Sequence, residues 1–395
     1  MGRLTIAGNG NKSDRSVSRR SLLSTGWRGL AAANLIGMMP KLTAAAAGGR
    51  SVVCLYLLGG SDGNSIIAPL DGAQYDAWAA SRGELALPQS DLLPVQTRSA
   101  GTRYGFHPAL AELQQLFNLG SLAVVANVGS QARITPKGPP PLKAILPEVR
   151  YSSLTFVTDG YATLQWAAAK AGITGVDRDR VFTFPGGVTM LPLGGSSFTG
   201  GSRRRNPDLI RFEESAAGFM PFPDTPAGRQ LRTVAGLIQS GGAGAAGEVF
   251  FVPVAGMNIG AQEVTRIDPA FRQLSQALGA FYQATLGLGL DRQVVTFTDS
   301  EFGRTMSPNS QHGSNAGWGN HQIVVGGGVK GGEVYGAFPE ISAPALDSDG
   351  SLIPTTPRES YHGTLASWTG LSDSEVISLF PALPRNGAWR MGFMA

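Results

Sequence analysis

The chain has 395 residues, of which 42% are hydrophobic and 15% are charged. This composition predicts a globular protein with a large buried core and excludes an intrinsically disordered chain. The formal net charge of +4 comes from residues 1–47, which hold seven basic side chains and a single acid. The remainder is slightly acidic, and its one basic run, Arg203-Arg204-Arg205, is interpreted as a solvated loop, so we expect no nucleic-acid partner.

Residues 1–47 are predicted to be a twin-arginine signal peptide. Arg19 and Arg20 in "SRRSLLS" precede the apolar stretch "GLAAANLIGMMP", and small residues follow as far as Ala47. A charged region, an apolar region and a cleavage region in this order are typical of a secretory signal, and the paired arginines indicate the twin-arginine route. The apolar stretch is too short to span a bilayer, so we expect no stable transmembrane anchor. The mature chain would be exported in the folded state by the twin-arginine machinery and would be periplasmic or secreted.

The mature chain is predicted to be a single α/β domain over residues 48–395. Its β-rich runs are continuously apolar, which is typical of strands buried on both faces of a mainly parallel sheet. Amphipathic helical patterns lie between these runs and predict an α/β sandwich. The expected strands are residues 51–58, 122–128, 248–254, 293–299 and 321–327, and the expected helices are residues 108–120, 227–242 and 269–289. Cys54, the only cysteine, cannot form an internal disulfide; it lies in the first strand and is expected to be a buried, inert thiol.

Candidate site residues follow the predicted strands, where ligands bind in open α/β sheets. Asp62 and Ser65 come after the first strand in "GGSDGNS", where a carboxylate could hold a metal and a hydroxyl could face a substrate. Glu301 and Arg304 follow a later strand and could bind a metal and an anion, or pair with each other across the turn. Asp62 could also do no more than form its turn.

The histidines and the glycine-rich stretches match no standard catalytic motif. The chain has four histidines, at positions 107, 312, 321 and 362, and their spacing fits none of the usual zinc sites. His107 is interpreted as a residue that begins a helix, and His321 as one that begins a strand. No nucleophile elbow, phosphate-binding loop or dinucleotide fingerprint is present, and "GGGVKGG" is interpreted as a turn between strands.

Several stretches together resemble a bacterial family, domain of unknown function family 1501, which belongs to the alkaline phosphatase/sulfatase-like superfamily. The clearest are "LYLLGGSDGNSIIAP" (55–69), "GFHPAL" (105–110), "FTDSEFGRTMSPN" (297–309) and "GWGNHQIVVGGGVKGGEVYG" (317–336). The resemblance covers nearly the whole mature chain. It implies an alkaline-phosphatase-like, three-layer α/β/α sandwich with a mainly parallel sheet, in which hydrolytic relatives hold one or two divalent cations above the sheet.

The chain departs from the family pattern at three motifs. Asp62, Glu301, Arg304 and His321 stand at matching positions. Where the family has acids and imidazoles, this chain instead has Met257-Asn258-Ile259-Gly260, Ser153-Leu154-Thr155-Phe156 and Asn315-Ala316-Gly317-Trp318-Gly319. Each departure removes an imidazole, and at least two remove a carboxylate. The resemblance therefore implies a degenerate metal site.

These departures favour a non-catalytic binding or envelope-associated protein without a cofactor, whose ligand or envelope partner the sequence does not identify. The alternative is a metal-dependent hydrolase of phosphate or sulfate esters with a remodelled single-metal site. In that alternative, Asp62 and Glu301 would hold zinc, calcium or magnesium, and Ser65, Arg304 and His321 would be the catalytic residues. Ser65 or a water would then be the nucleophile, and Arg304 would bind the anion.

Overall fold

The computed structural model describes residues 49–57, 59–129, 182–184, 188–190, 221–240, 249–254, 256–257, 260–300, 302–341, 345–380 and 382–395. These residues all fall within the unit Ala44–Ala395. The predicted signal peptide lies outside the described residues. So do Glu301, Asn258 and the stretch 153–156.

The main sheet is mixed, with mostly parallel strands. Strand β1 (Ser51–Leu57) lies in its interior and pairs in parallel with β8 (Val249–Val254) on one side and β9 (Val294–Ser300) on the other. Next to β9 comes β12 (Asn320–Val325), which is antiparallel to both β9 and β5 (Leu122–Gly129). The outer strands on one side are β13 (Glu333–Tyr335) and β14 (Thr356–Pro357), both beside β5. On the other side, β7 (Val188–Met190) lies beside β8, and β6 (Phe182–Phe184) lies beside β7.

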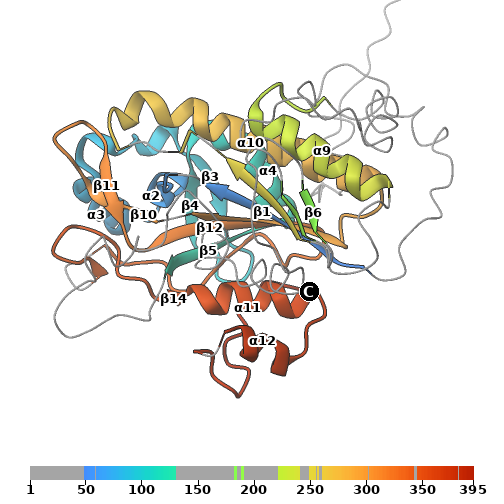
Figure 1. Ribbon diagram of the computed structural model, residues 1–395. Helices are drawn as coiled ribbons and strands as arrows, with labels where there is room; N and C mark the ends of the chain where they lie inside the picture. The colour runs from blue at the N-terminus through green and yellow to red at the C-terminus, as the bar shows by residue number, and fades with distance from the viewer. Residues whose placement is uncertain are drawn as a thin grey trace, which may run out of the picture. The chain divides into compact units, whose positions relative to one another are not determined.

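Helices cover both faces of this sheet, which explains why the strands are continuously apolar. Alternate residues of β1 point to opposite sides, so that Val53 and Leu55 pack in one core cluster while Val52 and Cys54 pack in another. The first cluster includes residues of α4 (Ala111–Leu119), α9 (Pro226–Ser240) and α10 (Glu263–Gly287), and the second includes residues of α11 (Arg358–Trp368). In Figure 1, α9 and α10 lie on one side of the sheet, and α11 and α12 (Asp373–Leu379) lie on the other.

Two small sheets and several short helices surround the end of the main sheet where β1 and β9 finish. The small sheets are β2 (Ile67–Pro69), β4 (Arg103–Phe106) and β3 (Leu93–Gln96), and β10 (Gly303–Pro308) with β11 (Ser314–Gly317). The short helices are α2 (Gly63–Ile66), α3 (Gly72–Arg82), η2 (Gly83–Leu85), η3 (Gln89–Asp91) and η4 (Pro108–Leu110).

Most predicted elements are confirmed, and one helix begins earlier than expected. The five predicted strands correspond to β1, β5, β8, β9 and β12, with ends that differ by one or two residues. Helix α10 begins at Glu263, although Pro269 was expected near its first turn. Ile267 explains the difference, since this residue upstream of the proline is buried in the core cluster and tertiary packing outweighs the local proline signal.

Two smaller predictions about single features are also confirmed. The Cys54 side chain is buried, as its apolar surroundings indicated. The glycine-rich stretch 326–332 links β12 to β13, and Gly331 packs against the backbone of Leu122 at the start of β5. Across the described residues, no helix is both long enough and apolar enough to cross a membrane.

Candidate functional site

The carboxyl ends of the parallel strands bring the candidate residues to one edge of the sheet. Strands β1, β8 and β9 all end there, and β12 begins there because it runs antiparallel to β9. Strand β5 runs antiparallel to β12 and therefore also ends at this edge. Asp62 follows β1, and Arg304 is the second residue of β10, the strand that follows β9. Strand β12 begins with Asn320 and His321. The stretches after these strands therefore lie at the same edge of the sheet.

Asp62 lies at the amino end of α2 and forms a buried ion pair. Its Oδ1 accepts a hydrogen bond from the backbone N–H of Asn64 at 3.2 Å, which caps this short helix. Its Oδ2 lies 2.6 Å from Nη2 of Arg82, and neither side chain has any solvent-exposed surface. The predicted turn-forming role of Asp62 is therefore present, but its carboxylate also neutralises a buried guanidinium.

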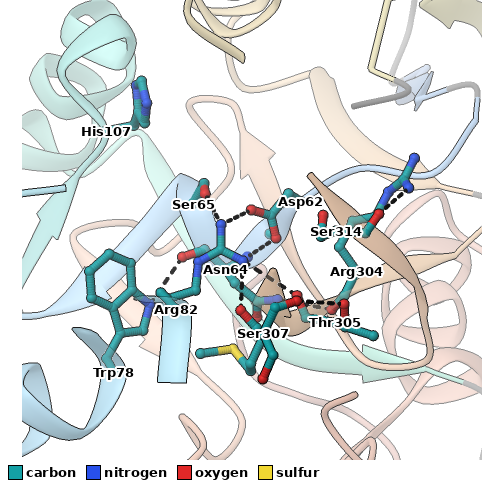
Figure 2. Close-up of polar contacts among 12 residues, drawn as sticks. Asp62, Asn64, Ser65, Trp78, Arg82, His107, Arg304, Thr305, Ser307 and Ser314 are labelled. Atoms are coloured by element: carbon teal, nitrogen blue, oxygen red, sulfur yellow. Dashed lines mark hydrogen bonds and ion pairs between the residues drawn. The ribbon is translucent and has the colours of Figure 1, made fainter. Parts of the chain in front are cut away.

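Helix α3 positions Arg82 over the loop that follows β1. Trp78 and Arg82 are one turn apart on the same face, and the Trp78 indole donates to the backbone carbonyl of Asn64 at 3.2 Å. The sequence offered no indication of Arg82, because it lies 20 positions after Asp62 and belongs to a helix that we did not predict. Figure 2 shows its guanidinium beside Asp62, Ser65 and the backbone of β10.

The Arg82 guanidinium is surrounded by oxygen atoms. Nη2 donates to Oγ of Ser65 at 2.6 Å as well as to the Asp62 carboxylate. Nη1 donates to the backbone carbonyls of Thr305 at 3.4 Å and Met306 at 3.3 Å, both on β10. One carboxylate, one hydroxyl and two carbonyls therefore contact a single cation that the chain itself supplies.

Arg304 holds two loops together from the first residues of β10. Its Nη1 donates to the carbonyl of Ser314 at 3.0 Å, and its Nη2 donates to the carbonyl of Gly59 at 2.7 Å. The guanidinium also lies over the ring of Phe302, 5.3 Å from the ring centroid. The side chain is buried, and its predicted pairing with Glu301 stays a prediction because Glu301 lies outside the described residues.

Asn320 connects the loop after β1 to the end of β9. Its Nδ2 donates to Oγ of Ser61 at 2.8 Å and to Oγ of Ser300 at 2.7 Å. Its Oδ1 accepts from the backbone N–H of Gly63 at 2.9 Å and of His321 at 3.0 Å. This buried amide thus uses two donor and two acceptor positions to hold neighbouring segments together.

His321 begins β12 as predicted, and its ring is part of the packed interior. Its Nδ1 accepts a hydrogen bond from the backbone N–H of Asn127 at 3.0 Å. The ring stacks on Phe338 with centroids 4.9 Å apart. Burial lowers the pKa of His321 to about 4, although the negative charge of Asp62 opposes this shift. The imidazole is therefore neutral at pH 7.

The stretch Gly313-Ser314-Asn315-Ala316-Gly317-Trp318-Gly319-Asn320 forms β11 and leads into β12. Asn315 is exposed, and its Oδ1 accepts from Nδ2 of Asn309 at 3.1 Å. Close backbone contacts account for the glycines, since a Cβ on Gly317 would lie 2.5 Å from the carbonyl carbon of Arg304, and a Cβ on Gly313 would lie 2.5 Å from that of Gly260. The hairpin geometry is therefore retained where the resemblance places a lost acid and a lost imidazole.

A second buried polar contact joins α11 to β9, and the sequence did not indicate it. Nε2 of His362 on α11 lies 2.8 Å from Oδ2 of Asp299, and both side chains are buried. Arg358 also approaches this carboxylate, with Nη2 3.7 Å from Oδ1. This cluster attaches α11 to the end of β9.

The described residues at this edge do not fit a divalent metal ion. No group of three or more His, Cys, Asp or Glu side chains within the described ranges could hold one. Zinc usually takes three protein ligands, and calcium takes at least six oxygens. Asp62 is already paired with Arg82, while Glu301, the other predicted ligand, lies outside the described residues.

Comparison with known protein families gives a match over the carboxyl-terminal part of the site. No curated protein matches the chain. The matched range includes Arg304, Asn315, Asn320 and His321 but not Asp62 or Arg82, so the resemblance outside it stays a prediction. Residues 261–356 match the model of the family described as protein of unknown function (DUF1501).

Proposed function

We propose that this protein is an exported, non-catalytic binding or envelope-associated protein with an alkaline-phosphatase-like, three-layer α/β/α fold and a degenerate metal site. The observation that carries the proposal is the Asp62–Arg82 ion pair at 2.6 Å, in which both side chains are fully buried. The positive charge of the guanidinium offsets the negative charge of this carboxylate, and this weakens the attraction of the carboxylate for a metal ion.

The other residues expected to take part in hydrolysis also have internal roles. Arg304 donates to the carbonyls of Gly59 and Ser314, whereas an anion-binding arginine would direct its donors towards the substrate. Ser65 accepts a hydrogen bond from Arg82, and a cation beside the hydroxyl is no general base that could take its proton. These contacts support a scaffold in which former site residues hold loops in place.

Export is the second part of the proposal. It rests on Arg19 and Arg20, followed by an apolar stretch and small residues, and it makes the protein periplasmic or secreted. The loops at this edge of the sheet would then present a rigid surface to a ligand or partner in the cell envelope. Replacing Arg19 and Arg20 by lysine should leave the protein in the cytoplasm, and unchanged export would contradict the twin-arginine route.

The test of the non-catalytic proposal uses the full-length chain, purified and supplied in turn with zinc, calcium, magnesium and manganese. Aryl phosphates and aryl sulfates are assayed as substrates, with Asp62→Ala as the matched variant. We expect no turnover above the level of this variant. Metal-dependent turnover that Asp62→Ala abolishes would overturn the proposal and establish the hydrolase alternative.

A further inference from the structure

We propose that Arg82 is a built-in cation, which occupies an oxygen-lined cation site and makes a bound metal ion unnecessary there. The inference rests on the proposed function and deepens it, because it identifies what replaced the metal in the degenerate site. It concerns the group of atoms around the Arg82 guanidinium, drawn in Figure 2.

The chemistry of the surrounding atoms is that of a site for a hard cation. The guanidinium contacts Oδ2 of Asp62, Oγ of Ser65 and the carbonyl oxygens of Thr305 and Met306. Carboxylate, hydroxyl and carbonyl oxygens are the ligands that calcium and similar hard ions take in proteins. These oxygens come from the loop after β1, from α2 and from β10, so a cation among them joins three separate segments.

The charge of the site favours a guanidinium over a divalent ion. Among the contacts of Arg82 given above for the described part of the chain, Asp62 supplies the formal negative charge. A guanidinium carries a single positive charge and balances this carboxylate, whereas a divalent ion would leave an excess charge in a fully buried position. Its planar array of N–H groups also reaches several acceptors at once.

The arginine is held in place from its own helix. Trp78, one turn earlier on α3, donates to the carbonyl of Asn64, which fixes the helix against the loop that carries Asp62. The cation is therefore part of the chain itself, positioned by helix α3. The site is filled whatever the concentration of free metal ions in solution.

The test removes the guanidinium and supplies cations from solution. Arg82→Ala leaves the oxygens around an open space, and the double variant Asp62→Asn/Arg82→Ala is the matched control without the carboxylate. Thermal unfolding of both variants and of the wild-type chain is followed with millimolar guanidinium chloride, and with choline chloride as a control for ionic strength. We expect guanidinium to raise the Tm of Arg82→Ala by several degrees and to leave the other two proteins unchanged.

A further variant tests the oxygen ligands. Ser65→Asp/Arg82→Ala adds a second carboxylate, and isothermal titration should detect calcium binding that wild type lacks. The proposal is overturned if guanidinium has the same effect on Arg82→Ala and on the double control, or if the folded Ser65→Asp/Arg82→Ala variant binds no calcium. If Arg82→Ala does not accumulate, its refolding yield from urea with guanidinium or choline decides the same question.

These results are separable from a failure of the proposed function. If the wild-type chain is metal-free and inactive but guanidinium does not raise the Tm of Arg82→Ala, only the built-in cation is contradicted. A wild-type chain that binds metal and hydrolyses esters would contradict the non-catalytic proposal.

Discussion

The Arg82 guanidinium lies 2.6 Å from the Asp62 carboxylate, and both side chains are completely shielded from solvent. Taking two charges out of water is costly, and their attraction offsets this cost only while both partners remain. The pair therefore makes the loop after β1, helix α3 and strand β10 depend on one another. Substitutions at this pair test that dependence.

Removing one member of the pair should destabilise the protein strongly. Asp62→Ala leaves the guanidinium buried without its carboxylate, and we expect a loss of about 3–5 kcal/mol in the free energy of unfolding. Urea denaturation followed by circular dichroism measures this change. Arg229→Ala is the control, because the Arg229–Asp224 pair is exposed and its loss should have little effect. Equal stability of the two variants would contradict a buried, structural pair.

Replacing both charges together should cost less than replacing one. Asp62→Asn combined with Arg82→Met removes both charges while keeping similar side-chain volumes. We expect the double variant to be more stable than Asp62→Ala, because no unpaired charge remains inside. The unfolding free energies of Asp62→Asn and Arg82→Met are measured as well. If the losses of the two single variants add up to the loss of the double variant, Asp62 and Arg82 do not interact.

Asn320 should be far more sensitive to truncation than Asn315. The Asn320 amide pairs with two hydroxyls and two backbone N–H groups, and each buried group left unsatisfied costs about 1–3 kcal/mol. Asn320→Ala should therefore lose more than about 2 kcal/mol of unfolding free energy, which urea titration measures. Asn315→Ala is the matched control, since this side chain is exposed. A tolerated Asn320→Ala would rule out this network as a source of stability.

Gly303 should not tolerate a side chain, whereas Gly72 should. A Cβ at Gly303 would lie 2.0 Å from the carbonyl oxygen of Gly319, so the hairpin must shift, at a cost of at least about 1–3 kcal/mol. A Cβ at Gly72 meets nothing within 4 Å in the first turn of α3, and alanine there should be neutral or stabilising by up to about 1 kcal/mol. Melting temperatures of Gly303→Ala and Gly72→Ala compare the two positions. If the Tm of Gly303→Ala equals or exceeds that of Gly72→Ala, Gly303 does not lie as close to the carbonyl oxygen of Gly319 as the structure places it.

The main sheet could be predicted because its strands are buried on both faces. The run Ser51–Leu57 is continuously apolar since Val53 and Val52 face two different cores, and such runs stand out in a sequence. The same argument gave β5 and β9 with nearly correct ends. Helix α3 buries Trp78 and Arg82 while its other residues stay partly or fully exposed, so its sequence carries no clear apolar stripe and the helix was missed.

The candidate site could be predicted only in part. Asp62, Arg304 and His321 do lie at the carboxyl edge of the sheet, because strand direction alone brings the stretches after β1 and β9 together. The partner of Asp62 could not be predicted, since Arg82 lies on the missed helix α3. The contact between Asp299 and His362 was missed as well, because 63 positions separate the two residues. Contacts between distant segments depend on packing, which local spacing does not reveal.

Acidification should destabilise the protein between about pH 6.5 and pH 4. Burial lowers the pKa of both His107 and His321 to about 4, while an unfolded histidine titrates near about 6.5. Below about pH 6.5 the unfolded chain therefore binds more protons than the folded one, so stability falls as the pH decreases and this contribution levels off below about pH 4.

Each histidine contributes a slope of up to about 1.4 kcal/mol per pH unit in that window. The unfolding free energy of wild type and His321→Gln, measured by urea titration from pH 7.5 downwards, tests this. Glutamine can still accept from Asn127 but does not titrate, so the variant should show a shallower slope. Identical slopes would mean that His321 does not resist protonation in the folded state.

The metal content of the purified full-length protein tests the central claim most directly. The protein is dialysed against zinc, calcium and magnesium, freed of excess ions by gel filtration, and analysed for bound metal alongside Asp62→Ala. With Asp62 paired to Arg82, we predict far less than one equivalent of any metal and no difference between the two proteins. One equivalent of metal in the wild-type chain that Asp62→Ala abolishes would contradict the account.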